Sequence, residues 1–176
     1  MSRTLIIKKA RTVPVEVKRL RQITNTLLGE LLALENFELG LHLVRAPEMA
    51  RINQAFLSHE GPTDVITFDH SDLVGDDVRR LKHKKKSEPP HVGSYAGLTG
   101  ELYICHDVAR TQAHEFKTTW PEELVRYVIH GMLHLQGFDD HRPADRRKMK
   151  REENRLLRVL GRRFPISKLA QRARPA

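Results

Sequence analysis

Two histidines, His130 and His134, stand four residues apart in an apolar stretch of the chain. Four residues advance about 400° around a helix and about 6 Å along it, so both rings leave the same helix face one turn apart. Two neutral imidazoles in this arrangement can bind one Zn²⁺. A bare pair with this spacing is more often hydrogen-bonded inside a helical core, so the residues that follow decide between the two interpretations.

An acidic turn follows the pair within seven residues, where Asp139, Asp140 and His141 come just after Gly137. Three protein ligands with one open position are typical of catalytic zinc, whereas structural zinc usually has four protein ligands. We therefore predict a zinc site with His130, His134 and either Asp140 or His141 as ligands. Asp139, or whichever of Asp140 and His141 is not a ligand, is the candidate for accepting a proton.

A buried helix is expected to position the two imidazoles. Thr119 and Glu122 form a capping box at its start, and Pro121 sits where a missing N–H is tolerated. Apolar residues between 124 and 135 are too many for a single surface stripe, which predicts burial on most sides. Gly137 can adopt the left-handed conformation that ends the helix.

Short strands and helices make up the remainder of the chain. Alternation of apolar and polar residues predicts a strand at 37–44, and short apolar segments are strand candidates at 4–8, 65–68 and 99–105. Helical spacing predicts helices at 14–34, 48–57, 107–116 and 143–160. Because the strands are few and follow no regular βαβ series, the sequence predicts an α+β fold, with a small mixed sheet of about four strands packed with helices.

The composition favours a polyanionic partner. The 176 residues include 31 Lys and Arg against 22 Asp and Glu, which gives a net charge of +9. This balance is typical of proteins that bind nucleic acid or anionic surfaces. No apolar run approaches the ~18 residues that a membrane span needs, the N-terminus lacks the apolar centre of a signal peptide, and the lone Cys105 excludes an internal disulfide. We expect a cytoplasmic protein that does not associate with membranes.

A single catalytic domain is expected over residues 1–160. Residues 71–98 break the pattern, because they contain a basic run and a proline pair in HKKKSEPPH at 83–91. We expect a mobile insertion there, with a short helix near 76–81. Residues 161–176 form a basic tail without an acidic residue, which is a candidate for disorder.

Three motifs resemble the YbeY family of bacterial zinc-dependent endoribonucleases. HGMLHLQGFDDH at 130–141 is similar to the family's HGxLHLxGxDH, PTDVITFD at 62–69 to PTDVLSFP, and GELYICHDVARTQA at 100–113 to a GEIxI strand followed by a helix ending in QA. The resemblance covers about residues 37–160. It implies a four-stranded α+β fold, one Zn²⁺ per chain, and single-stranded RNA rather than DNA as substrate. It also implies a role at the ribosomal small subunit, in maturation of the 16S rRNA 3′ end and in ribosome quality control.

The chain departs from the family pattern at two positions that concern the site. The family's third histidine aligns with Asp140, while a histidine follows at 141; alignment favours the first as ligand and ligand type favours the second. The family's usual arginine six residues before Thr63 is replaced by Leu57. Arg45 and Arg51 are candidate substitutes for its phosphate contact, and an ordinary solvated helix end is the alternative. The insertion at 71–98 is also longer than the family's usual connection.

The turn before the third expected strand contributes two weaker candidates, Thr63 and Asp64. They can orient substrate or hydrogen-bond a ligand histidine, and a simple turn cap is the alternative.

Three functions are compatible with these residues. The first is a zinc endoribonuclease, in which zinc lowers the pKa of its bound water to ~7 and polarises a phosphoryl oxygen. The second is a ribosome-binding or RNA-binding assembly factor with a structural zinc. The third is a zinc hydrolase acting on another substrate, against which Gly131 counts, because zinc peptidases with HExxH carry their general base at that position.

Overall fold

A mixed β-sheet forms the centre of the molecule. The computed structural model describes residues 2–71 and 97–171. Within these residues one sheet contains β1 (Arg3–Lys9), β2 (Phe37–Val44), β3 (Val65–Asp69) and β4 (Leu98–Cys105). The strand order is β1-β2-β4-β3; β2 is parallel to β1 and β4, and β3 is antiparallel to β4. The predicted α+β class with a small mixed sheet is confirmed.

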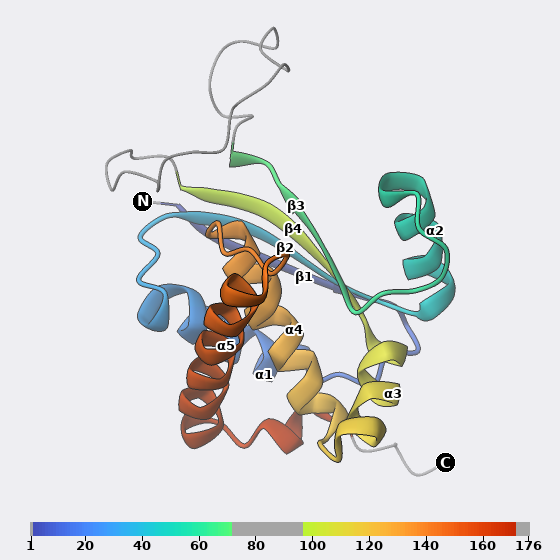
Figure 1. The fold of residues 1–176 in the computed structure, drawn as a ribbon. Helices are drawn as coiled ribbons and strands as arrows, with labels where there is room; N and C mark the ends of the chain where they lie inside the picture. The colour runs from blue at the N-terminus through green and yellow to red at the C-terminus, as the bar shows by residue number, and fades with distance from the viewer. Residues whose placement is uncertain (1, 72–96, 172–176) are drawn as a thin grey trace, which may run out of the picture.

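Helices cover the two faces of this sheet unequally. The helices are α1 (Val17–Thr26), α2 (Ala46–Leu57), α3 (His106–Phe116), α4 (Trp120–Leu135) and α5 (Pro143–Arg163), with a π-helical turn at Leu27–Leu31 and a 3-10 turn at Ile166–Leu169. Figure 1 shows α1, α4 and α5 on one face and α2 on the other. The large core lies under α1, α4 and α5, and alternate residues of β2 belong to it: Phe37, Leu39, Leu41 and Leu43. A smaller cluster that includes Met49 and Ile66 lies under α2.

Helix α4 has the start and end that its sequence predicts. The backbone N–H of Thr119 donates to Glu122 Oε2 at 3.1 Å, and Gly137 has a φ of 85° just beyond the helix. Gly131 packs closely on the sheet, because a Cβ there would lie 2.7 Å from Leu102 Cδ2 on β4. The position after His130 therefore faces β4, which explains in packing terms why it holds glycine.

Two sequence expectations are wrong at the ends of the chain. The helix expected from residue 14 begins at Val17, because Val15 forms a β-bridge with Ala170 and Glu16 caps the helix by accepting from Lys18 and Arg19 N–H groups. The expected boundary at residue 160 also fails, since α5 continues to Arg163 and Leu169 is fully buried in the core. Residues 161–171 thus belong to the folded unit. The insertion expected at 71–98 falls mostly outside the described residues, as does its short helix at 76–81.

Candidate metal centre and adjoining cleft

The two imidazoles of α4 converge as their spacing predicts. His130 and His134 have their Nε2 atoms 3.0 Å apart, and their ring planes are 84° from each other. Both side chains are half-buried. Since α4 is packed on the sheet along most of its length, the backbone that carries both rings is fixed by the core.

Each imidazole is oriented through its other nitrogen. Nδ1 of His130 lies 2.6 Å from Glu153 Oε1 on α5, and Nδ1 of His134 lies 3.1 Å from the backbone oxygen of Phe138. Both partners are acceptors, so both Nδ1 atoms act as donors. This fixes the tautomer in which each Nε2 is unprotonated and has a lone pair directed away from the acceptor at Nδ1, as is usual for metal-binding histidines.

The two lone pairs meet in a way that fits a cation. With both Nδ1 atoms protonated, two neutral Nε2 atoms 3.0 Å apart are both acceptors and repel each other unless a proton or a metal ion lies between them. Burial alone would lower the pKa of His130, but the hydrogen bond and charge of Glu153, with the charges of Asp64 and Asp140, raise it above its ordinary value. The surroundings therefore favour positive charge at this point.

Asp140 supplies a third donor to the same point. One donor atom from each of His130, His134 and Asp140 lies within 4.8 Å of the other two. The His141 side chain is 81% exposed, and its Nδ1 lies 3.6 Å from Oδ1 of both Asp139 and Asp140. His141 forms a separate group with these two aspartates, without the α4 histidines. Of the two alternatives for the third ligand, the geometry groups Asp140 with the imidazoles.

A donor set of two nitrogens and one carboxylate oxygen suits a transition metal such as zinc. Calcium and magnesium prefer sites made of oxygen ligands alone. In the part of the chain that the structure describes, this group has three potential ligands, His130, His134 and Asp140. Three protein ligands with one open position are typical of a catalytic zinc site. The residues present therefore fit a zinc ion.

Glu153 is the functional residue that the sequence motifs missed. It is 5% exposed and belongs to the buried face of α5, together with Met149, Leu156 and Leu160. The spacing of 149, 153, 156 and 160 places a carboxylate inside an apolar stripe. That pattern was a usable signal, because a buried acid requires a partner.

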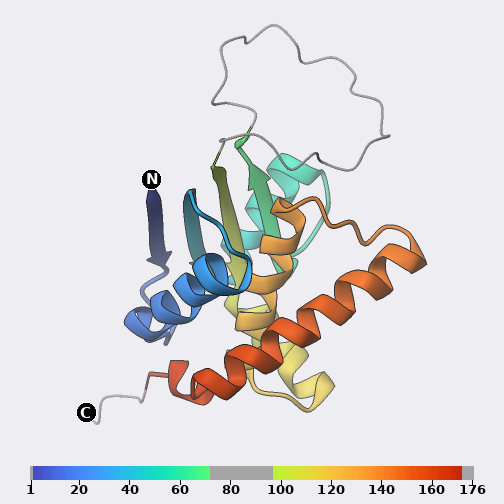
Figure 2. The same ribbon diagram turned by 90° about the vertical axis from the view of Figure 1, so that its left-hand side faces the viewer.

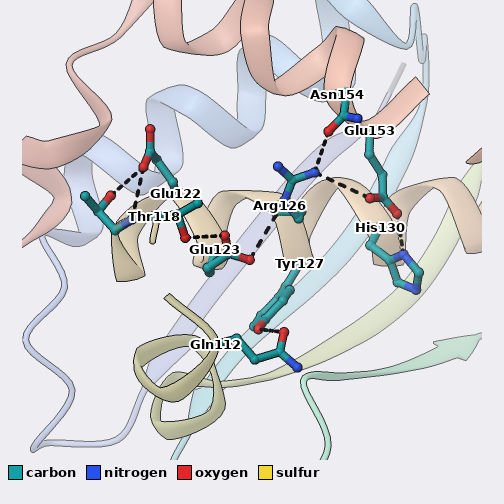
Figure 3. A network of polar contacts seen from close by, with 10 residues as sticks. Gln112, Thr118, Glu122, Glu123, Arg126, Tyr127, His130, Glu153 and Asn154 are labelled. Atoms are coloured by element: carbon teal, nitrogen blue, oxygen red, sulfur yellow. Dashed lines mark hydrogen bonds and ion pairs between the residues drawn. The ribbon is translucent and has the colours of Figure 1, made fainter. Parts of the chain in front are cut away.

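Arg126 links Glu153 to a second buried acid, Glu123 (Figure 3). Its Nη1 donates to Asn154 Oδ1 at 2.8 Å and lies 3.7 Å from Glu153 Oε2, while its Nε lies 3.8 Å from Glu123 Oε2. Glu123 also accepts from the Thr118 hydroxyl at 2.6 Å. These contacts anchor α5 to α4 beside His130, where Figure 2 shows the long α5 crossing α4.

A cleft of about 470 Å³ opens beside the metal donors and includes Asp64 in its lining, with His130 and Asp140. Thr63 does not line it; its hydroxyl donates to Asp64 Oδ1 at 3.0 Å, and the N–H of Val65 donates to the same oxygen at 2.9 Å. The TDV turn thus holds the Asp64 carboxylate at the cleft.

The two arginines proposed as phosphate contacts lie elsewhere. Arg45 Nε donates to Asp107 Oδ2 at 2.8 Å, which ties the start of α2 to the start of α3. Arg51 lines a different, shallow pocket on α2. Neither is among the residues that line the cleft beside His130.

Comparison of the sequence with known proteins identifies the family of this chain. The profile of the family described as Endoribonuclease YbeY matches residues 6–161. The chain belongs to the YbeY family. A YbeY protein from Chlorobium luteolum is 38% identical over 110 residues, which are 62% of this chain and 64% of the relative. The Thermobifida fusca YbeY is 31% identical over 145 residues, 82% of this chain and 86% of the relative.

A solved structure has the same fold. The solution structure of TM1509 from Thermotoga maritima superposes with a TM-score of 0.60 at 23% identity and covers 98% of this chain and 99% of that protein. The alignment to the Chlorobium YbeY spans just under two thirds of that relative's length.

Among the described residues, no helix has the length and apolar character to cross a membrane.

Proposed function

We propose that this protein is a zinc-dependent, single-strand-specific endoribonuclease acting on ribosomal RNA. The observation that carries the proposal is the convergence of His130, His134 and Asp140 donor atoms within 4.8 Å in a YbeY family chain, where His130 and Asp140 also line a cleft. The net charge of +9 suits a polyanionic substrate. We propose the 3′ end of 16S rRNA at the small ribosomal subunit as substrate, the cytoplasm as location and ribosome quality control as context.

Different side chains would hold the metal ion and orient its ligands. Zinc held by His130, His134 and Asp140 would act as a Lewis acid toward the phosphoryl oxygen and would lower the pKa of water at the open position to ~7. His130 and His134 present their Nε2 atoms, while Glu153 and the Phe138 carbonyl hold the tautomers. Against the effect of burial, the hydrogen bond and charge of Glu153 raise the pKa of His130, which makes the His130 Nε2 a stronger metal ligand.

The candidates for proton transfer are two residues of the turn next to the metal ligands, Asp139 and His141. Asp139 accepts from the backbone N–H of His141 at 3.0 Å, and His141 extends into solvent beside it. We propose that these two residues, at the exposed edge of the turn, exchange protons with the attacking or leaving oxygen. Asp64, which lines the cleft from the other side, orients the substrate.

Two features of the site disfavour the alternative functions. A structural zinc in an assembly factor usually has four protein ligands, whereas the group in the described chain has three members, the two α4 histidines and Asp140. A zinc peptidase of the HExxH type needs a carboxylate where this chain has Gly131, and a Cβ there would lie 2.7 Å from Leu102.

The test combines metal analysis with RNA cleavage. Purified protein should contain one zinc per chain and cleave a single-stranded RNA. His134→Ala should lose both, and His59→Ala, which changes an exposed histidine outside the site, should lose neither. Full cleavage by a correctly folded His134→Ala variant would refute the proposal, and RNA binding without any cleavage by the zinc-loaded wild type would favour the assembly factor.

A further inference from the structure

The cleft extends well beyond the metal donors. Its wall continues over Gln112 and Phe116 on α3, Tyr127 on α4, and Arg146 and Lys150 on α5. Its volume of about 470 Å³ lies in the range of sites that enclose a small organic molecule. None of these five side chains has a role in holding a metal ion.

The inner part of the cleft is unsuited to phosphate. The carboxylates of Glu123 and Glu153 line it and are 3% and 5% exposed, so their charge is poorly screened by water. A phosphate placed there would meet two buried negative charges, which Arg126 only partly balances. A neutral, planar group with hydrogen-bonding edges is suited to this part.

Gln112 offers such a group a fixed donor. The hydroxyl of Tyr127 donates to Gln112 Oε1 at 2.7 Å, and burial raises the pKa of Tyr127, so the phenol keeps its proton. Because the amide oxygen is engaged, the amide N–H groups are directed elsewhere; Figure 3 shows the nitrogen of Gln112 pointing away from Tyr127. A nucleobase carbonyl is a matching acceptor.

The outer edge of the cleft has the opposite character. Arg146 and Lys150 are exposed, lie one turn apart on α5, and contribute two positive charges to the lining. Arg146 also donates from Nε to the backbone oxygen of Asp140 at 3.1 Å, which places this edge next to the metal donors. Phe116 lines the cleft with an aromatic ring that is 58% exposed.

We propose that this cleft binds one unpaired nucleotide of the RNA, adjacent to the cleaved phosphodiester. Its base enters the cleft, stacks on Phe116 and accepts a hydrogen bond from Gln112, while its phosphate stays at Lys150 and Arg146. Proteins recognise single-stranded RNA in this way, through splayed bases stacked on aromatic rings and hydrogen-bonded along their edges. The proposal rests on the proposed function, because it names the part of the substrate that lies next to the metal.

The first test compares two cations on one helix. Binding of a fluorescent, 2′-O-methylated ten-nucleotide uridine RNA to the zinc-loaded protein is measured by anisotropy, with a gel to confirm that the probe stays intact. Lys150→Glu should weaken binding at least ~10-fold and Phe116→Ala between ~5- and ~100-fold. Arg151→Glu, the matched control, makes the same charge change at the next residue, which is exposed and outside the cleft lining, and should weaken binding only ~2-fold.

The second test asks whether a base occupies the cleft. A single abasic nucleotide is moved along the probe, and one position should weaken wild-type binding about as much as Phe116→Ala does. At that position the variant should show no further loss, because both changes remove the same contact. The nucleotide proposal is overturned if Lys150→Glu matches Arg151→Glu, or if the abasic and Phe116→Ala effects simply multiply.

These outcomes separate the cleft from the enzyme. If the variants behave as expected but zinc-loaded wild type leaves natural RNA intact, the nucleotide site stands and the endoribonuclease proposal falls. Wild type could instead cleave RNA while Phe116→Ala and Lys150→Glu bind and cleave RNA no differently from the control Arg151→Glu. In that case the endoribonuclease proposal stands and the nucleotide site falls. Both surface variants should retain the wild-type thermal midpoint, since neither removes a buried group.

Discussion

Two imidazoles of this protein, His130 at the α4–α5 interface and His106 at the start of α3, lie in opposite environments. His130 at the α4–α5 interface has a carboxylate 2.6 Å from Nδ1, and its pKa is raised. His106 at the start of α3 is 2% exposed, packs edge-on against Trp120, and has no hydrogen-bond partner at either ring nitrogen among the described residues. Burial, with the charges of Arg45 and Arg110, lowers the pKa of His106 although Asp107 opposes this.

The difference shows that partners, rather than burial, separate a candidate ligand from a core residue. A histidine whose Nδ1 is anchored to an acceptor presents a defined lone pair at Nε2. His106 is less exposed than His130, but in the described part of the chain neither of its ring nitrogens has a hydrogen bond that would fix the tautomer; the carboxylate of Asp107 lies 3.9 Å from Nδ1.

The largest effect is expected at the third donor. Asp140→Ala should lower zinc affinity by more than ~100-fold, since it removes a donor atom that lies within 4.8 Å of both imidazole donors. His141→Ala should change affinity less than ~3-fold, because its ring is 81% exposed and forms no group with the α4 histidines. Competition with a fluorescent zinc chelator measures both affinities. The reverse ranking would mean that His141 turns inward to hold the metal.

A smaller effect is expected when the anchor of His130 is removed. Glu153→Gln keeps an acceptor for Nδ1 but not its charge, so zinc affinity should fall ~10-fold, whereas Glu153→Ala should lose ~100-fold. The same chelator competition measures both, and a near-normal unfolding transition would show that the loss is local.

The neighbouring residue provides the control for Glu153. Glu152 is paired with Arg155 at 2.6 and 2.8 Å on the outer side of α5, where such pairs contribute little to stability. Glu152→Gln should leave zinc affinity unchanged. If it weakened zinc as much as Glu153→Gln, the general charge of α5 rather than the contact with His130 would be responsible.

The sequence predicted the features that depend on neighbouring residues along the chain. The capping box at Thr119, the left-handed Gly137 and the shared face of His130 and His134 follow from local spacing, and all three are present. Strand 37–44 was predicted with its observed bounds, because apolar and polar positions alternate from Phe37 to Leu43.

Features that depend on distant packing were beyond local patterns. The contact of Glu153 with His130 requires α5 to lie against α4, and the bridge of Val15 with Ala170 joins opposite ends of the chain. The choice between Asp140 and His141 depends on side-chain direction in a turn, which has no periodicity to read. His106 belongs to no sequence motif, and its burial against Trp120 depends on how the start of α3 packs on α4.

The smallest effect tests the other half of the contrast. Since the pKa of His106 is lowered in the folded state, the unfolded chain binds more protons there below ~6.5, and stability contributed by this residue falls as pH decreases from that value. His106→Phe keeps a ring beside Trp120 and removes two unpartnered nitrogens, so the free energy of unfolding at pH 7 should rise by ~1 kcal/mol. The gain should grow toward pH 5.5 in urea titrations. His114→Gln, which changes an exposed histidine of the same helix, should stay within ~0.5 kcal/mol of wild type. A gain that shrinks as pH falls would mean that His106 is charged in the folded protein and shares the electrostatic character of His130.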